Sequence, residues 1–289
     1  MKATLSILLS VIFSVAHGQE SLLVSPQWLN DHKNDPDLVI LQPNQMKLDY
    51  DLEHITGARY VWPPNVSPDS PHGTMNAPEV EKANELFGSL GISNNSRVVL
   101  CHVRNEVSQT TRIFLVLEQM GMKGKVMFLN GGLEAWKKAG FAVTSEVPVI
   151  KKTKFKAAVA PVIVDKEYVK EHLHSSSTVI VDARAKSFYD GDPAGQPRDG
   201  HIAGAQNIPF AEMYDPVNYV FKPSDQLQNF FAPVATKDKE LVVYCFIGQT
   251  ASVVYMSGRI LGYNMKLYDG SIQEWSRINE LPMEKIEKK

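Results

Sequence analysis

One cysteine lies where a thiolate could act as a nucleophile. Cys245 follows the apolar run 241–244 and precedes a short segment, 246–251, that contains Gly248; residues 252–261 then have a helical pattern. Strand, tight loop and helix in this order can turn successive backbone N–H groups toward the sulfur, and the positive end of the helix dipole favours an anion there. Both effects favour the thiolate, which is the nucleophilic form of cysteine. The pattern is typical of covalent catalysis through sulfur.

The same residues are also compatible with two less active roles for the thiol. A free cysteine is more often a small buried hydrophobic residue, and Gly248 is compatible with an ordinary turn. The second cysteine of the chain, Cys101, could form a disulfide with Cys245 in an exported protein, although a core of this size needs no such link. Local sequence therefore leaves a nucleophile, a buried thiol and a disulfide open.

The elements around these cysteines occur twice in the chain of 289 residues. Five segments recur in the same order, at separations from 139 (275 − 136) to 147 (201 − 54) residues. The cysteines match at a separation of 144 (245 − 101). The matched segments are 24–29 with 164–169, 39–42 with 179–182, 53–58 with 200–205, 98–101 with 241–245 and 130–136 with 269–275. Such a long-period repeat indicates a duplicated domain with insertions in its loops.

Each half has the pattern of an α/β domain. Short β-branched runs such as 179–181 alternate with helical patterns, which favours βαβ units around a mainly parallel sheet flanked by helices. We predict one domain at residues 22–145, a linker at 146–161 and a second domain at 162–284.

The N-terminal residues 1–18 resemble a secretory signal peptide, with a lysine, an apolar run and a small-x-small end. We therefore expect an exported protein, periplasmic if bacterial and otherwise secreted, with no membrane attachment after cleavage. With 44% hydrophobic residues, 21% charged residues and a net charge of −2, the chain has the composition of a globular protein. This charge balance gives no indication of a nucleic-acid partner.

Taken together, the motifs resemble those of tandem rhodanese-domain sulfurtransferases from about residue 22 to 282. They are the two halves, the His-Ile-x-Gly-Ala turn at His201, the Asp-Ala-Arg strand end at Asp182 and the Cys-x-x-Gly-x-Thr loop at Cys245, with Trp136 and Trp275 after the glycine turns. The resemblance implies two rhodanese-like domains and a double displacement without metal or organic cofactor. Cys245 would take a sulfane sulfur from a small-molecule donor, hold it as a persulfide and pass it to a small-molecule acceptor or to a thiol on a partner protein.

The resemblance also implies roles for residues around the nucleophile. The loop N–H groups would stabilise the charged outer sulfur, and Arg184 would bind an anionic donor or support the loop. Arg198 is a second candidate, with an ordinary surface arginine as the alternative. The implied site consists of Cys245 as nucleophile with Arg184, Arg198, Phe246, Ile247, Gly248, Gln249, Thr250 and Ala251.

Departures from the family pattern bear on the donor. Relatives that prefer thiosulfate have basic side chains just after the cysteine, and relatives that prefer 3-mercaptopyruvate have a Gly-Ser pair there. This chain has Phe246 and Ile247, and Phe188 replaces a second arginine. The donor is left open, and an apolar mouth suits a larger or less charged one.

The first half has the features of a non-catalytic copy. Its loop after Cys101 has no glycine and contains Glu106, and Gln42 replaces the aspartate of the second half. The resemblance implies that this half completes the pocket from its side. A second sulfur site or a resolving thiol at Cys101 is an alternative, as is a buried strand-end cysteine.

Two other functions compete with catalysis at Cys245. A phosphatase would need an arginine six residues after its nucleophile to bind phosphate. Ala251 and Val107 occupy these positions, which argues strongly against a phosphatase. A sulfur carrier or interaction module that accepts a persulfide without turnover stays open.

Overall fold

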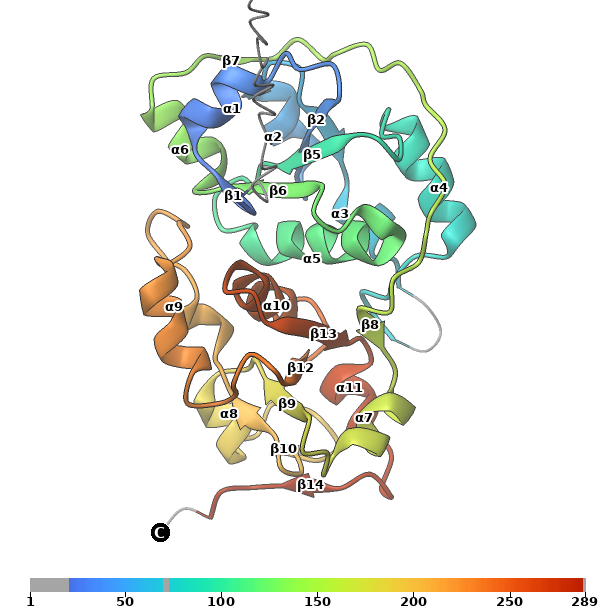
Figure 1. Ribbon diagram of the computed structural model, residues 1–289, viewed down its shortest axis with the longest axis vertical. Helices are drawn as coiled ribbons and strands as arrows, with labels where there is room; N and C mark the ends of the chain where they lie inside the picture. Colours follow the sequence, from blue (N-terminus) through green and yellow to red (C-terminus); the bar gives the residue numbers. More distant parts are fainter. Residues whose placement is uncertain (1–20, 70–72, 288–289) are drawn as a thin grey trace, which may run out of the picture.

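The computed structural model describes residues 21–69 and 73–287. The expected signal peptide, residues 1–18, lies outside this part. Figure 1 shows two α/β units, one above the other, with helices α5 (Val107–Leu117) and α10 (Ala251–Ile260) between them.

The first unit is built on a five-stranded parallel sheet with a small antiparallel pair beside it. The strands are β1 (Leu23–Val24), β2 (Leu38–Pro43), β3 (His54–Ile55), β4 (Arg59–Val61), β5 (Arg97–Leu100), β6 (Val126–Leu129) and β7 (Val143–Thr144). The helices are α1 (Pro26–His32), α2 (Lys47–Leu52), α3 (Pro63–Val66), α4 (Val80–Ser89), α5, the π-helical turn η1 (Glu118–Met122) and α6 (Gly132–Lys138). The sheet order is β1-β6-β5-β2-β4, and β3 pairs with β7.

The second unit repeats this arrangement. Its strands are β8 (Ile163–Val164), β9 (Thr178–Asp182), β10 (His201–Ile202), β11 (Gln206–Asn207), β12 (Glu240–Tyr244), β13 (Asn264–Tyr268) and β14 (Met283–Glu284). Its helices are α7 (Lys166–His172), α8 (Lys186–Asp190), the 3-10 turn η2 (Phe210–Glu212), α9 (Ser224–Phe231), α10 and α11 (Ser271–Trp275). The parallel sheet has the order β11-β9-β12-β13-β8, and β10 pairs with β14. The predicted α/β fold with two mainly parallel sheets is confirmed.

The sequence accounts for these elements locally. The strands β2 and β12 are short apolar runs buried along almost their whole length, as expected for parallel strands covered on both faces. The helices α1 and α7 begin at matching caps: the Ser25 side chain accepts the N–H of Trp28, and the Asp165 side chain accepts the N–H of Tyr168.

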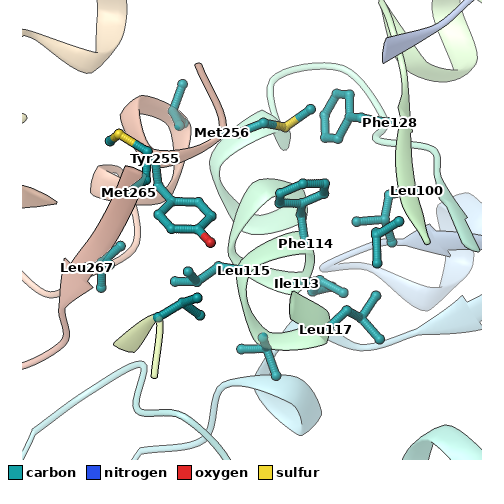
Figure 2. Close-up of a cluster of buried hydrophobic side chains, with 14 of the residues drawn as sticks. Leu100, Ile113, Phe114, Leu115, Leu117, Phe128, Tyr255, Met256, Met265 and Leu267 are labelled. Carbon is teal, nitrogen blue, oxygen red and sulfur yellow. The ribbon is translucent and has the colours of Figure 1, made fainter. Parts of the chain in front are cut away.

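The two units share one hydrophobic core across α5 and α10. Figure 2 shows this core, with Phe114 and Leu115 of α5 and Tyr255 and Met256 of α10 among its side chains. The helix α5 is buried along most of its length, and the apolar run 113–117 in its second half belongs to this core. The units are therefore joined by a continuous apolar interface.

The segment between the units, residues 145–160, has no helix or strand and runs along the outside of the first unit (Figure 1). Phe155 of this segment is buried, with its ring edge-on to Phe87 at a centroid distance of 5.3 Å. The connection is therefore bound to the surface of the first unit.

The strand ladders correct the alignment of the two halves. In the first sheet Leu100 pairs with Phe128, and in the second Val243 pairs with Leu267. Phe128 and Leu267 are separated by 139 residues (267 − 128), which is the separation of the two matched tryptophans. Leu100 therefore corresponds to Val243, at a separation of 143 (243 − 100).

This register places His102, not Cys101, at the position of Cys245. Backbone hydrogen bonds agree, because the His102 carbonyl accepts the N–H of Leu133 and the Cys245 carbonyl accepts the N–H of Ile272, again 139 residues on (272 − 133). The expected match of the two cysteines is wrong by one residue. Cys101 corresponds instead to the last residue of β12.

Candidate active site

Cys245 lies at the carboxyl end of β12, between β9 and β13 in the sheet, and the loop after it leads into α10. Its backbone N–H donates to the Ser271 hydroxyl at 3.2 Å, and its carbonyl accepts the Ile272 N–H at 3.1 Å. The thiol is free, and only 1% of the residue is exposed. The start of α11 thus fixes the backbone of the cysteine.

The backbone N–H groups of residues 246–251 are free of acceptors among the residues that the structure describes. Gly248 lies in the middle of this loop with φ +83°, a left-handed conformation that favours glycine. A Cβ at this position would lie 3.0 Å from a carboxylate oxygen of Asp269, so the close approach also requires glycine. Unpaired N–H groups gathered in one loop at a helix start are suited to bind an anion.

Ser271 holds the cysteine at some cost to its own backbone. Its φ is +51°, and a non-glycine residue in this region costs about 1–3 kcal/mol. Its hydroxyl accepts the N–H of Cys245 and donates to the Tyr268 carbonyl at 3.0 Å. A hydroxyl is therefore kept where the backbone alone would favour glycine.

Arg184 forms a buried ion pair beside the loop. Its guanidinium lies 2.6 Å from the Asp182 carboxylate and also donates to the Gly200 carbonyl at 2.6 Å. Burial acts to lower the pKa of Arg184, but the hydrogen bond and charge of Asp182 outweigh it and raise the pKa. The Arg184 guanidinium carbon also lies 5.1 Å from the ring centroid of Phe246. Its charge is offset by Asp182, and its position supports the loop.

The side chains after the cysteine form an apolar mouth. Phe246 and Ile247 are half-buried, and the Phe246 ring lies edge-on to Phe188 of α8 at a centroid distance of 5.2 Å. A cation–π contact with the Asp182-paired Arg184 completes this side of the mouth.

The rest of the loop faces the first unit. The Gln249 side chain donates to the Ser108 hydroxyl at 2.9 Å, Thr250 precedes the first turn of α10, and Ala251 is buried at its start. The structure thus brings Arg184 and residues 246–251 together around Cys245.

Arg198 lies elsewhere. Its guanidinium donates to four backbone carbonyls, those of Trp275, Ser276, Ile278 and Leu281, at 2.6–3.0 Å. These bonds secure the end of α11 and the chain that follows it. The contacts of Arg198 are those of a structural residue, and they do not support the donor-binding role expected for it.

The first unit contributes groups that sequence reasoning missed. The Ala77 N–H donates to the Asp269 carboxylate at 2.9 Å, and Thr74 donates to the Gln273 side chain through its N–H and its hydroxyl. Arg112 of α5 pairs with Asp269 at 2.6 Å. The signal for Arg112 was a single charge next to the apolar run 113–117, since a charge within a buried helix needs a partner.

In the corresponding loop of the first unit, some backbone N–H groups already donate to acceptors of the same unit. The Arg104 N–H donates to the Glu134 carboxylate at 2.9 Å, and the Glu106 N–H donates to the Val103 carbonyl at 3.0 Å. Burial lowers the pKa of His102 to about 4. Gly132 occupies the position that Ser271 has in the second unit. This loop has fewer N–H groups left to bind an anion.

Cys101 is fully buried beside this loop. Burial, followed by the charge of Glu134, raises the pKa of its thiol. Both effects disfavour a reactive thiolate. The structure also holds Cys101 and Cys245 as separate free thiols.

The second unit covers the first in return. The Phe221 N–H donates to the Asn130 side chain at 2.9 Å, and the Tyr219 ring lies edge-on to His102. Asn130 corresponds to Asp269 (269 − 130 = 139), which receives the Ala77 N–H from the first unit. Each unit therefore provides a segment that closes the loop region of the other.

A cavity of about 440 Å³ lies between the units beside this site. It is lined by Gly73, Asn76, Ile163, Val164, Asp165, Tyr168, Asp269, Gly270, Gln273 and Glu274. Within residues 21–69 and 73–287, no cluster of three or more His, Cys, Asp or Glu side chains could hold a metal ion. The helices in these ranges are too short or too polar to cross a membrane.

Comparison with known proteins identifies the family. The rhodanese-like domain model matches twice, at residues 25–139 and 165–278. The chain belongs to the rhodanese-like family. The sulfur carrier protein TtuD of Thermus thermophilus is 30% identical, over 94% of this chain and 100% of its own. The 3-mercaptopyruvate sulfurtransferase of Escherichia coli K12 is 29% identical, over 91% and 98%.

A solved structure of EanB in complex with ergothioneine has a similar fold. Its TM-score is 0.82 at 21% identity, covering 92% of this chain and 70% of the EanB chain. The tandem rhodanese-like chain is thus a sulfurtransferase with two rhodanese-like domains, as the sequence predicted.

Proposed function

We propose that Cys245 carries a sulfane sulfur from a donor such as thiosulfate or 3-mercaptopyruvate to an acceptor such as cyanide or a thiol. The thiolate attacks the donor sulfur, a bond from Sγ to that sulfur forms, and the donor's own bond to it breaks with the electron pair leaving on the donor. The acceptor then attacks the outer sulfur and releases the Cys245 thiolate. The steps balance without an external oxidant or a cofactor.

One observation carries this proposal. The thiol precedes six consecutive backbone N–H groups, those of residues 246–251, for which the described residues supply no acceptor. An outer persulfide sulfur is anionic, and N–H groups already in place stabilise such a charge without reorganisation. Gly248 allows the loop to close, and Ser271 holds the backbone of Cys245.

The mouth of the site favours a donor with little negative charge. Phe246 and Ile247 stand on the loop, and the nearby guanidinium of Arg184 is already paired with Asp182. A dianion such as thiosulfate gains little there to offset its loss of hydration. We therefore expect 3-mercaptopyruvate or an organic persulfide to load the enzyme faster than thiosulfate does.

Intact mass spectrometry after incubation with each donor tests the nucleophile. The wild type and Cys101→Ser are expected to gain one sulfur, and Cys245→Ser is expected to gain none. A sulfur gained by Cys245→Ser and lost in Cys101→Ser would transfer the role to Cys101 and overturn the proposal.

A carrier without turnover is a second candidate, favoured by the similarity to TtuD over nearly the whole chain. Thiocyanate release with cyanide as acceptor distinguishes the two. Repeated turnover supports the enzyme with small-molecule substrates, whereas loading of one sulfur that is released only to a thiol-bearing protein supports the carrier.

We further propose that the chain is exported after cleavage near residue 18. The support is the charged, apolar and small-residue pattern of its first residues. N-terminal sequencing of the protein recovered from outside the cytoplasm tests this, and an intact N-terminus there would contradict it.

A further inference from the structure

A buried arginine distinguishes the two helices between the units. Arg112 is the fifth residue after the start of α5 (112 − 107), and it is fully buried. At the same place in α10 (256 − 251) stands Met256, which belongs to the apolar core with Phe128 (Figure 2). At this position α5 therefore carries a charge and α10 carries an apolar side chain.

Arg112 contacts both units, and all three nitrogens of its guanidinium take part. On its own side it donates from Nε to the Ser67 hydroxyl at 3.0 Å and from Nη2 to the Met75 carbonyl at 2.5 Å. Across the interface Nη1 lies 2.6 Å from the Asp269 carboxylate and 3.5 Å from the Gly248 carbonyl. One side chain thus connects the first unit to two segments that flank the cysteine.

These contacts bear on the direction of the loop N–H groups. The Gly248 carbonyl points toward Arg112, and a trans peptide is planar with its N–H opposite its C=O. The N–H of Gln249, on the same peptide, therefore points away from Arg112. Asp269 lies two residues before Ser271, whose hydroxyl holds the N–H of Cys245.

We infer that Arg112 is a positioning residue for the sulfur site: it sets the orientation of the Gly248–Gln249 peptide and holds Asp269 against the loop. The inference deepens the proposed function and rests on it for the identity of the bound sulfur. The first unit then acts on the reaction through this arginine, in addition to covering the site.

The interface offers a matched control. Arg259 of α10 forms another ion pair across the interface, with the buried Glu118 of η1, the residue directly after α5. This pair links α10 to the end of α5 without contacting the loop 246–251. Arg112→Met and Arg259→Met each remove one ion pair across the same interface, and only the first removes a contact to the loop.

The experiment compares Arg112→Met, Arg112→Lys and Arg259→Met with the wild type. It measures thermal unfolding, kcat, the donor KM and the rate at which iodoacetamide alkylates the Cys245 peptide, followed by mass spectrometry. Arg112→Met is expected to lower kcat and alkylation at least ~10-fold, because oriented N–H donors commonly contribute this much or more, with the donor KM within about 3-fold. Arg112→Lys should recover part of the loss, and Arg259→Met should keep kcat within about 2-fold while lowering the melting temperature.

Equal losses in Arg112→Met and Arg259→Met would overturn the inference, as would an unchanged kcat and alkylation rate in Arg112→Met. Should Arg112→Met fail to fold, Asp269→Asn removes the charge of the partner and is expected to show the same pattern more weakly. If the wild type accepts sulfur from no donor, the proposed function fails, whereas the alkylation rates still test the positioning role.

Discussion

The two halves of this sulfurtransferase have corresponding strand-end loops that differ in whether their backbone N–H groups are hydrogen-bonded. After β12 the N–H groups of residues 246–251 face no acceptor among the described residues, and the side chain at the head of the loop is Cys245. After β5 the head of the loop is His102, and the carboxylate of Glu134 occupies the N–H of Arg104. In the first half, the Glu134 carboxylate thus occupies the place that we propose for a bound sulfur in the second half.

This difference separates the shared fold from the chemistry that we propose for the second unit. Both halves have the parallel sheet, the strand-end loop and the following helix. They differ in whether the loop contains glycine and in whether its N–H groups are already bonded. Glu134 corresponds to Gln273 (273 − 134 = 139), whose neutral side chain bonds to Thr74 instead.

The largest effect is expected from moving the thiol to the other loop. His102→Cys in a Cys245→Ser background should load sulfur at less than about one thousandth of the wild-type rate, because several N–H donors are lost together. Intact mass after donor treatment measures this, with Cys245→Ser alone as control. A persulfide at position 102 would show that the open loop is dispensable.

A second prediction concerns acid stability. Burial lowers the pKa of His102 to about 4, whereas in the unfolded chain the value is about 6.5. As the pH falls, the unfolded state therefore binds this proton before the folded state does. The free energy of unfolding decreases as the pH falls from about 6.5 toward 4. Between pH 7 and 4.5 the loss is about 2 kcal/mol.

Urea unfolding of the wild type and His102→Gln at both pH values measures this contribution. The free energy of unfolding of His102→Gln should fall by about 2 kcal/mol less than that of the wild type, because other titrating groups cancel in the difference. Parallel losses in the two proteins would contradict the burial of a neutral histidine.

A third prediction gives the second loop the acid of the first. Gln273→Glu places a carboxylate next to the N–H groups that we assign to the sulfur, and should slow persulfide formation by about tenfold through like-charge repulsion. Stopped-flow or quenched loading measures the rate. The matched control, Glu134→Gln, should leave loading unchanged, and equal effects of the two changes would remove the comparison between the loops.

The smallest effect is expected at Ser271, which corresponds to Gly132. In Ser271→Gly the relief of the positive φ offsets the lost hydrogen bond to Cys245, so the free energy of unfolding should change by less than about 1 kcal/mol. A fall in kcat of a few-fold is expected, because the cysteine backbone is held less firmly. A large loss of stability with normal kcat would reverse this assignment.

Most of the fold could be predicted from the sequence, because the repeat and the short apolar runs define the sheets. The alignment of the halves was harder. Each half has a cysteine after an apolar run, so the sequence alone favours an alignment of Cys101 with Cys245. The residues that pair across the strands decide otherwise, and a pairing register cannot be read from one strand alone.

The candidate site could be predicted where its residues are contiguous. Cys245 and the loop 246–251 follow one another in the chain, so a single motif contains them. Arg112 and Asp269 lie 157 residues apart (269 − 112), and only the packing of α5 against α10 brings them together. Arg198 shows the opposite case, since a motif placed it near the turn at His201 but its hydrogen bonds go to the end of α11 and the chain that follows.

The reciprocal closure of the two units makes each dependent on the other. The Ala77 N–H reaches Asp269 from one side, and the Phe221 N–H reaches Asn130 from the other. A chain truncated to either half would expose the apolar surfaces of α5 or α10 and leave one strand-end loop uncovered. Deletion of either unit is therefore expected to destabilise the one that remains.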